Sequence, residues 1–203
     1  MIPGAGNPPS QLVDDLKRRY SEPHRAYHTW AHIEALLGHC RTCAHLVHRP
    51  VPVLWAILWH DAIYDPNRND NEERSAQLLR SSARDILSAG DSDLSEAMVR
   101  ATAKHELPLH LNGRDLADCG LFLDLDLSIL AAPEASFDRY EKEIRQEYQH
   151  VPLPLFRATR AAILRRFLER QSLYFTPELV AKWEAPARAN LARSIARLTS
   201  SAP

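Results

Sequence analysis

The sequence predicts an all-α protein, and three observations lead to this fold class. Glycine is scarce, with 6 residues among 203. Alternating β-branched patterns, which would indicate strands, are nearly absent. Apolar residues instead recur at helical spacing, as in the stripe formed by Ile33, Leu36, Leu37, Cys40 and Ala44. We therefore expect a helical bundle of eight or nine helices.

Capping residues and prolines divide the periodic segments into the expected helices. Ser10 can cap the first helix, and the Ser-Glu-Pro sequence at 21–23 ends it. Pro133 and Pro154 lie near helix starts, where a missing N–H does no harm. The expected helices cover residues 10–20, 29–48, 53–64, 72–87, 94–105, 114–130, 133–149, 154–169 and 182–198.

Length and composition predict one globular domain over residues 1–203, with a core at about 20–130 and C-terminal helices at 133–199 packed on it. The formal net charge of −1 argues against a nucleic-acid polymer as partner. No apolar run approaches the ~20 residues of a membrane helix, and no signal-peptide pattern is visible. Three cysteines are too few for a disulfide framework. We expect a cytoplasmic monomer or homodimer without membrane contact.

The pair His60-Asp61 is the sharpest chemical feature of the sequence. It ends a strongly apolar segment that begins near Val53. A carboxylate buried there is costly unless a cation or several donors compensate it. Histidine is the commonest metal ligand, and this chain has 10 histidines, of which all but His150 precede residue 111. The pair is therefore a candidate metal site, although an isolated His-Asp pair is more often structural.

Two further segments bring ligand-capable groups onto apolar helices. His28 and His32 are spaced i, i+4 and share one helical face. Asp124 and Asp126 stand within an apolar stretch. Imidazole and carboxylate ligands together suit a divalent transition ion such as Mn, Fe, Co, Ni or Zn. Each segment is a weak signal alone, but the order His, His-Asp, Asp is much more specific.

These segments resemble the HD-domain superfamily of metal-dependent phosphohydrolases, and more narrowly a bacterial group of predicted HD phosphohydrolases. The resemblance covers residues 20–130 and rests on four motifs. They read Tyr27-His28-Thr29-Trp30-Ala31-His32-Ile33, Trp59-His60-Asp61-Ala62-Ile63-Tyr64, Asn71-Glu72-Glu73-Arg74-Ser75-Ala76 and Leu123-Asp124-Leu125-Asp126-Leu127. It implies an all-α bundle and hydrolysis of a small phosphorylated molecule, with nucleotides as the first choice.

The resemblance also implies a ligand set of His32, His60, Asp61 and Asp126 for one divalent ion. His32 is preferred over His28, and Asp126 over Asp124, because the residues after them follow the family pattern. Asn71 stands where some relatives have a further histidine, which favours one metal over two. His105 and His110 keep a second ion open.

In this interpretation the remaining polar residues would serve the reaction. The groups considered for catalysis are Glu72, Glu73, Lys104 and His105, and those for binding the substrate are Arg25 and His28. One of the glutamates would orient or activate water, and the cationic groups would stabilise the charge on the phosphoryl oxygens. The acidic pair is equally typical of an ordinary helix start, and Arg25 is equally typical of a surface charge.

Two other classes of function stay open at this point. One is a regulatory protein that binds metal or nucleotide without turnover. The other is a non-phosphate enzyme on the same scaffold, namely a lyase, a hydratase or an oxygenase. Fold analogy alone cannot choose among them. The Cys-x-x-Cys spacing at Cys40 and Cys43 is not an argument for structural zinc, because no second such pair exists.

Overall fold

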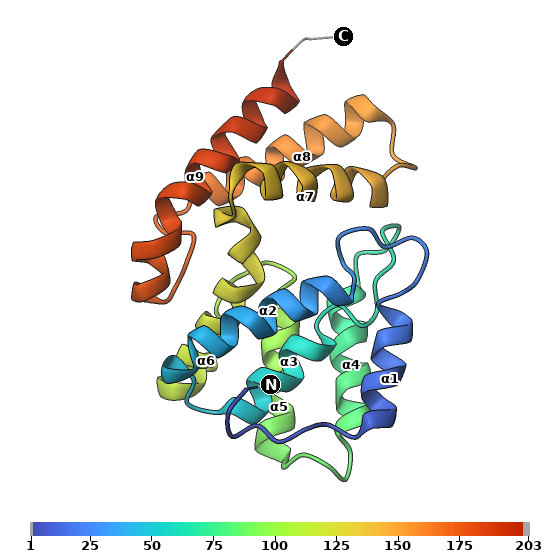
Figure 1. The fold of residues 1–203 in the computed structure, drawn as a ribbon, viewed down its shortest axis with the longest axis vertical. Coiled ribbons are helices and arrows are strands. Elements are labelled where there is room, and N and C mark those ends of the chain that lie inside the picture. The colour runs from blue at the N-terminus through green and yellow to red at the C-terminus, as the bar shows by residue number, and fades with distance from the viewer. Residues whose placement is uncertain (1, 201–203) are drawn as a thin grey trace. The chain divides into compact units, whose positions relative to one another are not determined.

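The computed structural model describes residues 2–200 and confirms the all-α fold class (Figure 1). Nine α-helices and two 3₁₀ turns make up the regular structure of this part of the chain. They are α1 (Ser10–Arg19), α2 (Trp30–Thr42), η1 (Ala44–Leu46), α3 (Pro50–Trp59), α4 (Asn71–Ala83), α5 (Ala89–Ala101), α6 (Gly113–Asp126), η2 (Leu127–Ala131), α7 (Glu134–Glu147), α8 (Leu153–Leu168) and α9 (Pro177–Thr199). None of these helices is both long and apolar enough to cross a membrane.

The chain divides into two compact units, one at residues 1–125 and one at 126–203. This boundary lies inside the expected core at 20–130, a few residues before the C-terminal helices expected from 133. The expectation of one domain, with the later helices packed on the core, stays a prediction.

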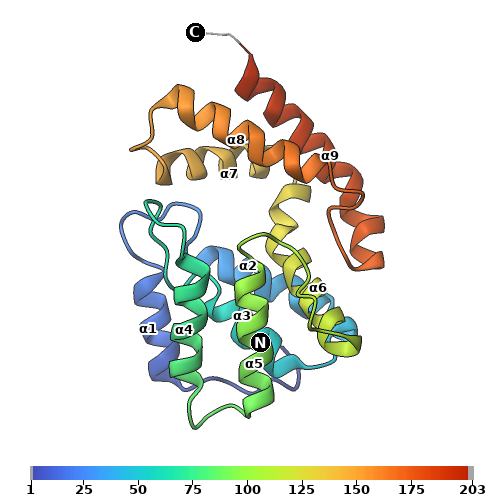
Figure 2. The same ribbon diagram turned by 180° about the vertical axis from the view of Figure 1, so that it is seen from behind.

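Helix α3 is the centre of the first unit. Its residues from Pro52 to Trp59 are all buried, and it packs against α2, α4 and α5. A helix that is apolar on every side must be surrounded in this way. The rings of Trp55 and Trp59 stack with their centroids 4.3 Å apart. Because α3 lies among these helices (Figure 2), the residues that follow Trp59 start from a helix that is packed on several sides.

The start of α3 lies earlier in the sequence than expected. Pro50 is the first residue of the helix, whereas the expected helix begins at residue 53. Asp118 of α6 explains the difference, because its carboxylate accepts the N–H groups of His48 at 2.8 Å and Arg49 at 2.7 Å. Burial raises the pKa of Asp118, and the two N–H donors oppose that rise. A helix start capped from another helix cannot be found by local sequence patterns.

Other boundaries also differ, with local causes. Helix α2 ends at Thr42 instead of residue 48, and the 3₁₀ turn η1 follows it. Helix α5 begins at Ala89 instead of residue 94, because the Ser88 hydroxyl accepts the N–H of Asp91 at 3.1 Å. Helix α9 begins at Pro177 instead of residue 182. The second unit is held by packing of α8 on α9 and of α7 and α9 on η2.

Candidate metal centre

Three of the predicted ligands come together in the first unit. His32 is the third residue of α2, and His60 and Asp61 directly follow α3. One ligand atom from each of the three lies within 4.8 Å of the others, and we call them the His-His-Asp group. His60 is 1% exposed and His32 is 6% exposed, whereas Asp61 is half-buried. The predicted convergence of His32 with the His60-Asp61 pair is therefore present in the structure.

The spacing of the donor atoms can be compared with that of metal ligands. His32 Nε2 lies 3.2 Å from His60 Nε2, and Asp61 Oδ2 lies 3.1 Å from His60 Nε2 and 3.9 Å from His32 Nε2. A point at about 2.0 Å from all three corners exists for a triangle with these sides, and 2.0–2.2 Å is the range of Zn–N and Zn–O bonds. The donor set and its spacing therefore fit a small divalent ion.

The ring orientation of His60 supports the same interpretation. Its Nδ1 lies 3.0 Å from the carbonyl oxygen of Ile57, which can only accept a hydrogen bond. Nδ1 therefore donates to this carbonyl, and the ring is held so that Nε2 faces the other members of the group. Such a backbone contact is the usual way in which proteins fix the tautomer of a ligating histidine.

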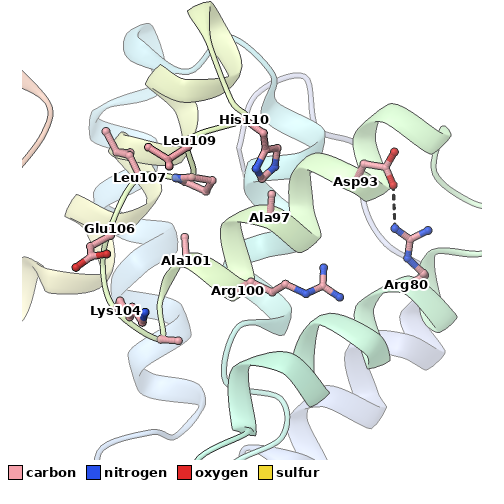
Figure 3. A pocket seen from close by; sticks show the side chains of 12 residues that line it. Arg80, Asp93, Ala97, Arg100, Ala101, Lys104, Glu106, Leu107, Leu109 and His110 are labelled. Carbon is pink, nitrogen blue, oxygen red and sulfur yellow. Dashed lines mark hydrogen bonds and ion pairs between the residues drawn. The ribbon is translucent and has the colours of Figure 1, made fainter.

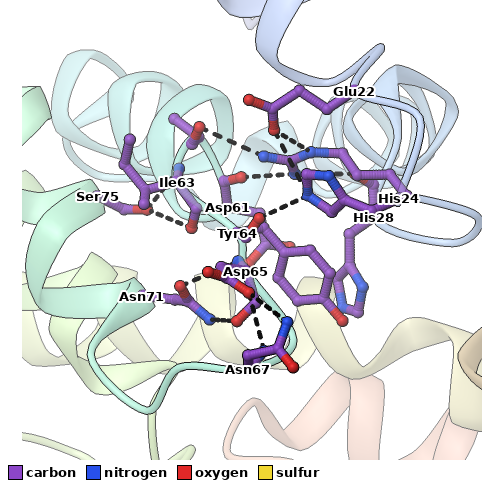
Figure 4. Close-up of polar contacts among 12 residues, drawn as sticks. Glu22, His24, His28, Asp61, Ile63, Tyr64, Asp65, Asn67, Asn71 and Ser75 are labelled. Atoms are coloured by element: carbon purple, nitrogen blue, oxygen red, sulfur yellow. Dashed lines mark hydrogen bonds and ion pairs between the residues drawn. The ribbon is translucent and has the colours of Figure 1, made fainter. Parts of the chain in front are cut away.

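Side chains of α4 hold the segment that follows Asp61 (Figure 4). The buried Ser75 hydroxyl accepts the N–H of Ile63 at 3.0 Å and donates to its carbonyl at 3.2 Å. The Asn71 amide likewise accepts the N–H of Asp65 at 3.1 Å and donates to its carbonyl at 3.0 Å. The motif at 71–76 therefore has a structural function, because it clamps the backbone beyond Asp61. The sequence analysis treated Asn71 only as a missing ligand.

Arg25, predicted to bind substrate, is buried in the protein. Its side chain is 0% exposed. Its guanidinium donates to the carbonyls of His28 at 3.0 Å and Asp61 at 2.8 Å. The guanidinium therefore binds main-chain oxygens. Arg25 is also not a surface charge, which was the alternative interpretation of this residue.

His28 lies among aromatic rings beside the His-His-Asp group. Its centroid is 4.3 Å from the Tyr64 ring and 6.2 Å from the His32 ring. Tyr27 contacts His32 from another direction, with centroids 4.9 Å apart. The ring of His24 stacks on the same Tyr64 ring, with centroids 6.2 Å apart, and its Nε2 donates to the Tyr64 carbonyl at 2.7 Å (Figure 4). His28 thus lies next to the group of three, and the preference for His32 over His28 as a ligand stays a prediction.

The two acids near the end of α6 differ in burial. Asp124 is 0% exposed and belongs to the first unit. Asp126 is half-buried and opens the second unit. Two residues of separation turn a helix by about 200°, so the carboxylates leave α6 on opposite sides. In the second unit, the charge of Asp126 contributes to a raised pKa of Tyr140, for which burial is the main cause. The choice of Asp126 over Asp124 as the fourth ligand stays a prediction.

The two candidate glutamates have different surroundings. Glu73 is exposed, and its carboxylate contacts Arg100 Nε at 2.6 Å and Gln77 at 2.8 Å. Arg100 and Gln77 hold the pKa of Glu73 below its usual value. Glu72 is half-buried in the first turn of α4, and among residues 2–200 its side chain makes no hydrogen bond or ion pair. Of the two, Glu72 is the carboxylate that is free to contact water.

Lys104 lines a separate cavity of about 440 Å³ beside α5 (Figure 3). No member of the His-His-Asp group lines this cavity. Its two arginines are already paired: Arg80 contacts Asp93 at 2.9 Å, and Arg100 contacts Glu73. His110 lines the same cavity. His105 lies earlier in the connecting segment and has a left-handed backbone conformation at φ 50°. These contacts do not favour Lys104 as a group of the metal centre, and its catalytic role stays a prediction.

Tyr20 is a residue of this centre that the sequence analysis missed. It is 1% exposed, its hydroxyl donates to the Leu58 carbonyl at 3.1 Å, and it accepts the N–H of Asp61 at 3.3 Å. A tyrosine at the end of an amphipathic helix gives no sign of this role in the sequence. Only the tertiary packing of α1 brings it to the end of α3.

No family model, curated protein or solved structure gives a significant match to this chain.

Proposed function

We propose that this protein is a divalent-metal-dependent phosphohydrolase that acts on a small phosphorylated molecule, with nucleotides as the first substrates to test. The observation that supports the proposal most is the His-His-Asp group, with its three ligand atoms within 4.8 Å. The order His, His-Asp, Asp along the chain, which resembles that of HD-domain phosphohydrolases, gives the reaction class.

His32, His60 and Asp61 would hold the ion. When bound, such an ion lowers the pKa of a coordinated water and polarises a phosphoryl oxygen. The ion also explains why two imidazoles and a carboxylate are kept so close together and so little exposed. A cation among them would stabilise the Asp61 carboxylate, which is half-buried and lies 3.1 Å from His60 Nε2.

Among the chain's own residues, Glu72 is the better candidate to orient water, because Glu73 is paired with Arg100. A carboxylate in that role accepts a proton from the attacking water. His28, beside His32, is the candidate to donate a hydrogen bond to a phosphoryl oxygen. Arg25 is a weaker candidate for a substrate contact, because its guanidinium is buried and donates to backbone carbonyls and to Glu22.

The test begins with metal content, measured by mass spectrometry on protein purified without a chelating tag. After incubation with Mn, Co, Ni or Zn, we expect about one ion per chain, which His60→Ala loses and His150→Ala keeps. His150 is a suitable control because it is exposed and belongs to the second unit. Phosphate release from nucleoside mono-, di- and triphosphates is then measured with the loaded protein.

The possible results separate the classes of function. Phosphate release that disappears in His60→Ala supports the hydrolase. Stoichiometric metal without turnover on any phosphorylated compound contradicts the hydrolase and leaves a metal-binding regulatory protein. Failure to bind any of the four ions contradicts the metal centre itself. Two irons per chain with a visible absorption band would instead identify an oxygenase.

A further inference from the structure

Arg25 joins three parts of the chain at one buried point. Its Nη1 donates to the carbonyls of His28 at 3.0 Å and Asp61 at 2.8 Å, and its Nη2 donates to that of Ala62 at 3.4 Å. Its Nε donates to Glu22 at 3.1 Å. The guanidinium thereby ties the loop that carries His28 to the backbone of the ligand Asp61.

The surroundings of the guanidinium make this contact rigid. Its central carbon lies 5.0 Å from the Tyr20 ring and 5.4 Å from the Tyr64 ring. The side chain is 0% exposed, whereas that of its carboxylate partner Glu22 is 40% exposed. A buried cation is stable only when its donors are satisfied, so the carbonyls must remain in place. Displacing them would leave the Nη donors of a buried charged group without hydrogen bonds, with only the Nε contact to Glu22 remaining.

The peptide groups on both sides of Asp61 are therefore fixed by different residues. The Tyr20 hydroxyl accepts a hydrogen bond from the N–H of Asp61, and Arg25 donates a hydrogen bond to the carbonyl oxygen of Asp61. With the N–H and the carbonyl both held, the direction in which the Asp61 side chain leaves the backbone is determined. The Asp61 carboxylate is the half-buried and least enclosed member of the His-His-Asp group, and so depends most on such support.

We propose that Arg25 is a positioning residue that orders Asp61 for metal binding and sets the place of His28 beside the metal centre. The proposal rests on the metal centre of the proposed function, but not on the identity of the substrate. Residues that orient a metal ligand without contacting the ion commonly change metal affinity by about 10- to 100-fold. We expect an effect of this size from Arg25.

The experiment measures the affinity for Co²⁺ by calorimetry and the Co²⁺ absorption spectrum in Arg25→Met and Arg25→Lys. We expect a 10- to 100-fold weaker affinity and an altered spectrum in Arg25→Met. Arg25→Lys keeps the charge but can donate hydrogen bonds to only some of these acceptors. We therefore expect a smaller loss of Co²⁺ affinity in this variant.

Arg145→Met is the matched control. Arg145 also donates from Nη1 to two carbonyls, those of Tyr148 and Val151 at 2.9 Å each, and lies 4.8 Å from the Phe156 ring. It belongs to the second unit. We expect this variant to lose thermal stability in the absence of metal, as Arg25→Met does, and to keep the wild-type Co²⁺ affinity and spectrum. This separates a positioning role from a purely structural one.

Unchanged Co²⁺ affinity and spectrum in folded Arg25→Met would overturn the proposal while leaving the metal centre intact. Absence of Co²⁺ binding in the wild-type protein would overturn the metal centre and the positioning role together. If Arg25→Met does not fold, Arg25→Lys decides, because an affinity equal to that of the wild type contradicts the need for the guanidinium. An Arg25→Ala variant supplies a further test, since methylguanidinium but not methylammonium should restore its affinity.

Discussion

The Nε2 atoms of His32 and His60 lie 3.2 Å apart, although the residues are separated by 28 positions and lie at the start of α2 and the end of α3. The Ile57 carbonyl orients the His60 ring so that its Nε2 faces His32. Two imidazole nitrogens at this distance can share one proton or one cation. The nearby carboxylate of Asp61 makes the site anionic and favours a cation.

The opposite directions of Asp124 and Asp126 on α6 lead to the first prediction. At most one of them can complete a site with the His-His-Asp group, because the two side chains leave the helix on different faces. We expect Asp126→Asn to weaken Zn²⁺ binding by at least 10-fold, and Asp124→Asn to lower stability with little effect on affinity. Calorimetric titration and urea unfolding of both variants measure these effects. The reverse pattern would make Asp124 the fourth ligand.

The hydroxyl of Ser75 leads to the second prediction, because it satisfies both backbone groups of Ile63. In Ser75→Ala these groups lose their partner next to the metal centre, and an unsatisfied buried polar group costs about 1–3 kcal/mol. We expect a loss of stability in this range, measured by urea unfolding without metal. Ser81→Ala in the same helix is the control, since Ser81 is exposed and bonds only to Leu78. An equal loss in both variants would contradict the clamp.

The cap of α3 leads to the third prediction. Asp118→Ala removes the acceptor of two N–H groups, so we expect a loss of about 2–3 kcal/mol in the free energy of unfolding. Asp115→Ala is its control, because the carboxylate of Asp115 is part-exposed and pairs with Arg49 at 2.9 Å. An exposed pair contributes at most about 1 kcal/mol. If the control costs as much as Asp118→Ala, the cap does not stabilise α3 as we argue.

The positions of these residues explain what the sequence could predict. The helices and the convergence of His32 with His60-Asp61 were predictable, because periodicity and the contrast of polar groups with an apolar segment are local signals. The burial of Arg25 was not, since it depends on α1 and the turn after α3 meeting around one side chain. The cap by Asp118 was missed for the same reason, because it joins residues 69 and 70 positions apart.

The glutamates show a second limit. Glu72 and Glu73 are equivalent in the sequence, and only the position of Arg100 on the neighbouring α5 distinguishes them. A prediction from sequence must therefore keep both. In the structure Glu73 forms an ion pair with Arg100, which gives this carboxylate a structural role. Glu72 is therefore the carboxylate to be tested for catalysis.

The buried thiols lead to the last prediction, which concerns pH. Burial raises the pKa of Cys40 and of Cys119 from 9.0 to about 12. At pH 8.5 their thiolate fractions are then about a thousand-fold lower in the folded protein than in the unfolded chain. We expect iodoacetamide to leave both unmodified in the native protein and to modify both in urea, as measured by mass spectrometry of the peptides. Rapid labelling of native Cys40 would contradict this.

The same shift fixes the sign of the pH dependence of stability. Because the unfolded thiols lose their protons near pH 9 and the native thiols only near pH 12, unfolding releases protons between these values. The free energy of unfolding must therefore fall as the pH rises through this window, by roughly 3 kcal/mol between pH 8 and pH 10 for the two groups together. We expect the variant Cys40→Ala/Cys119→Ala to show a shallower fall in urea unfolding over this interval. An equal slope in the variant and the wild type would mean that other groups cause it.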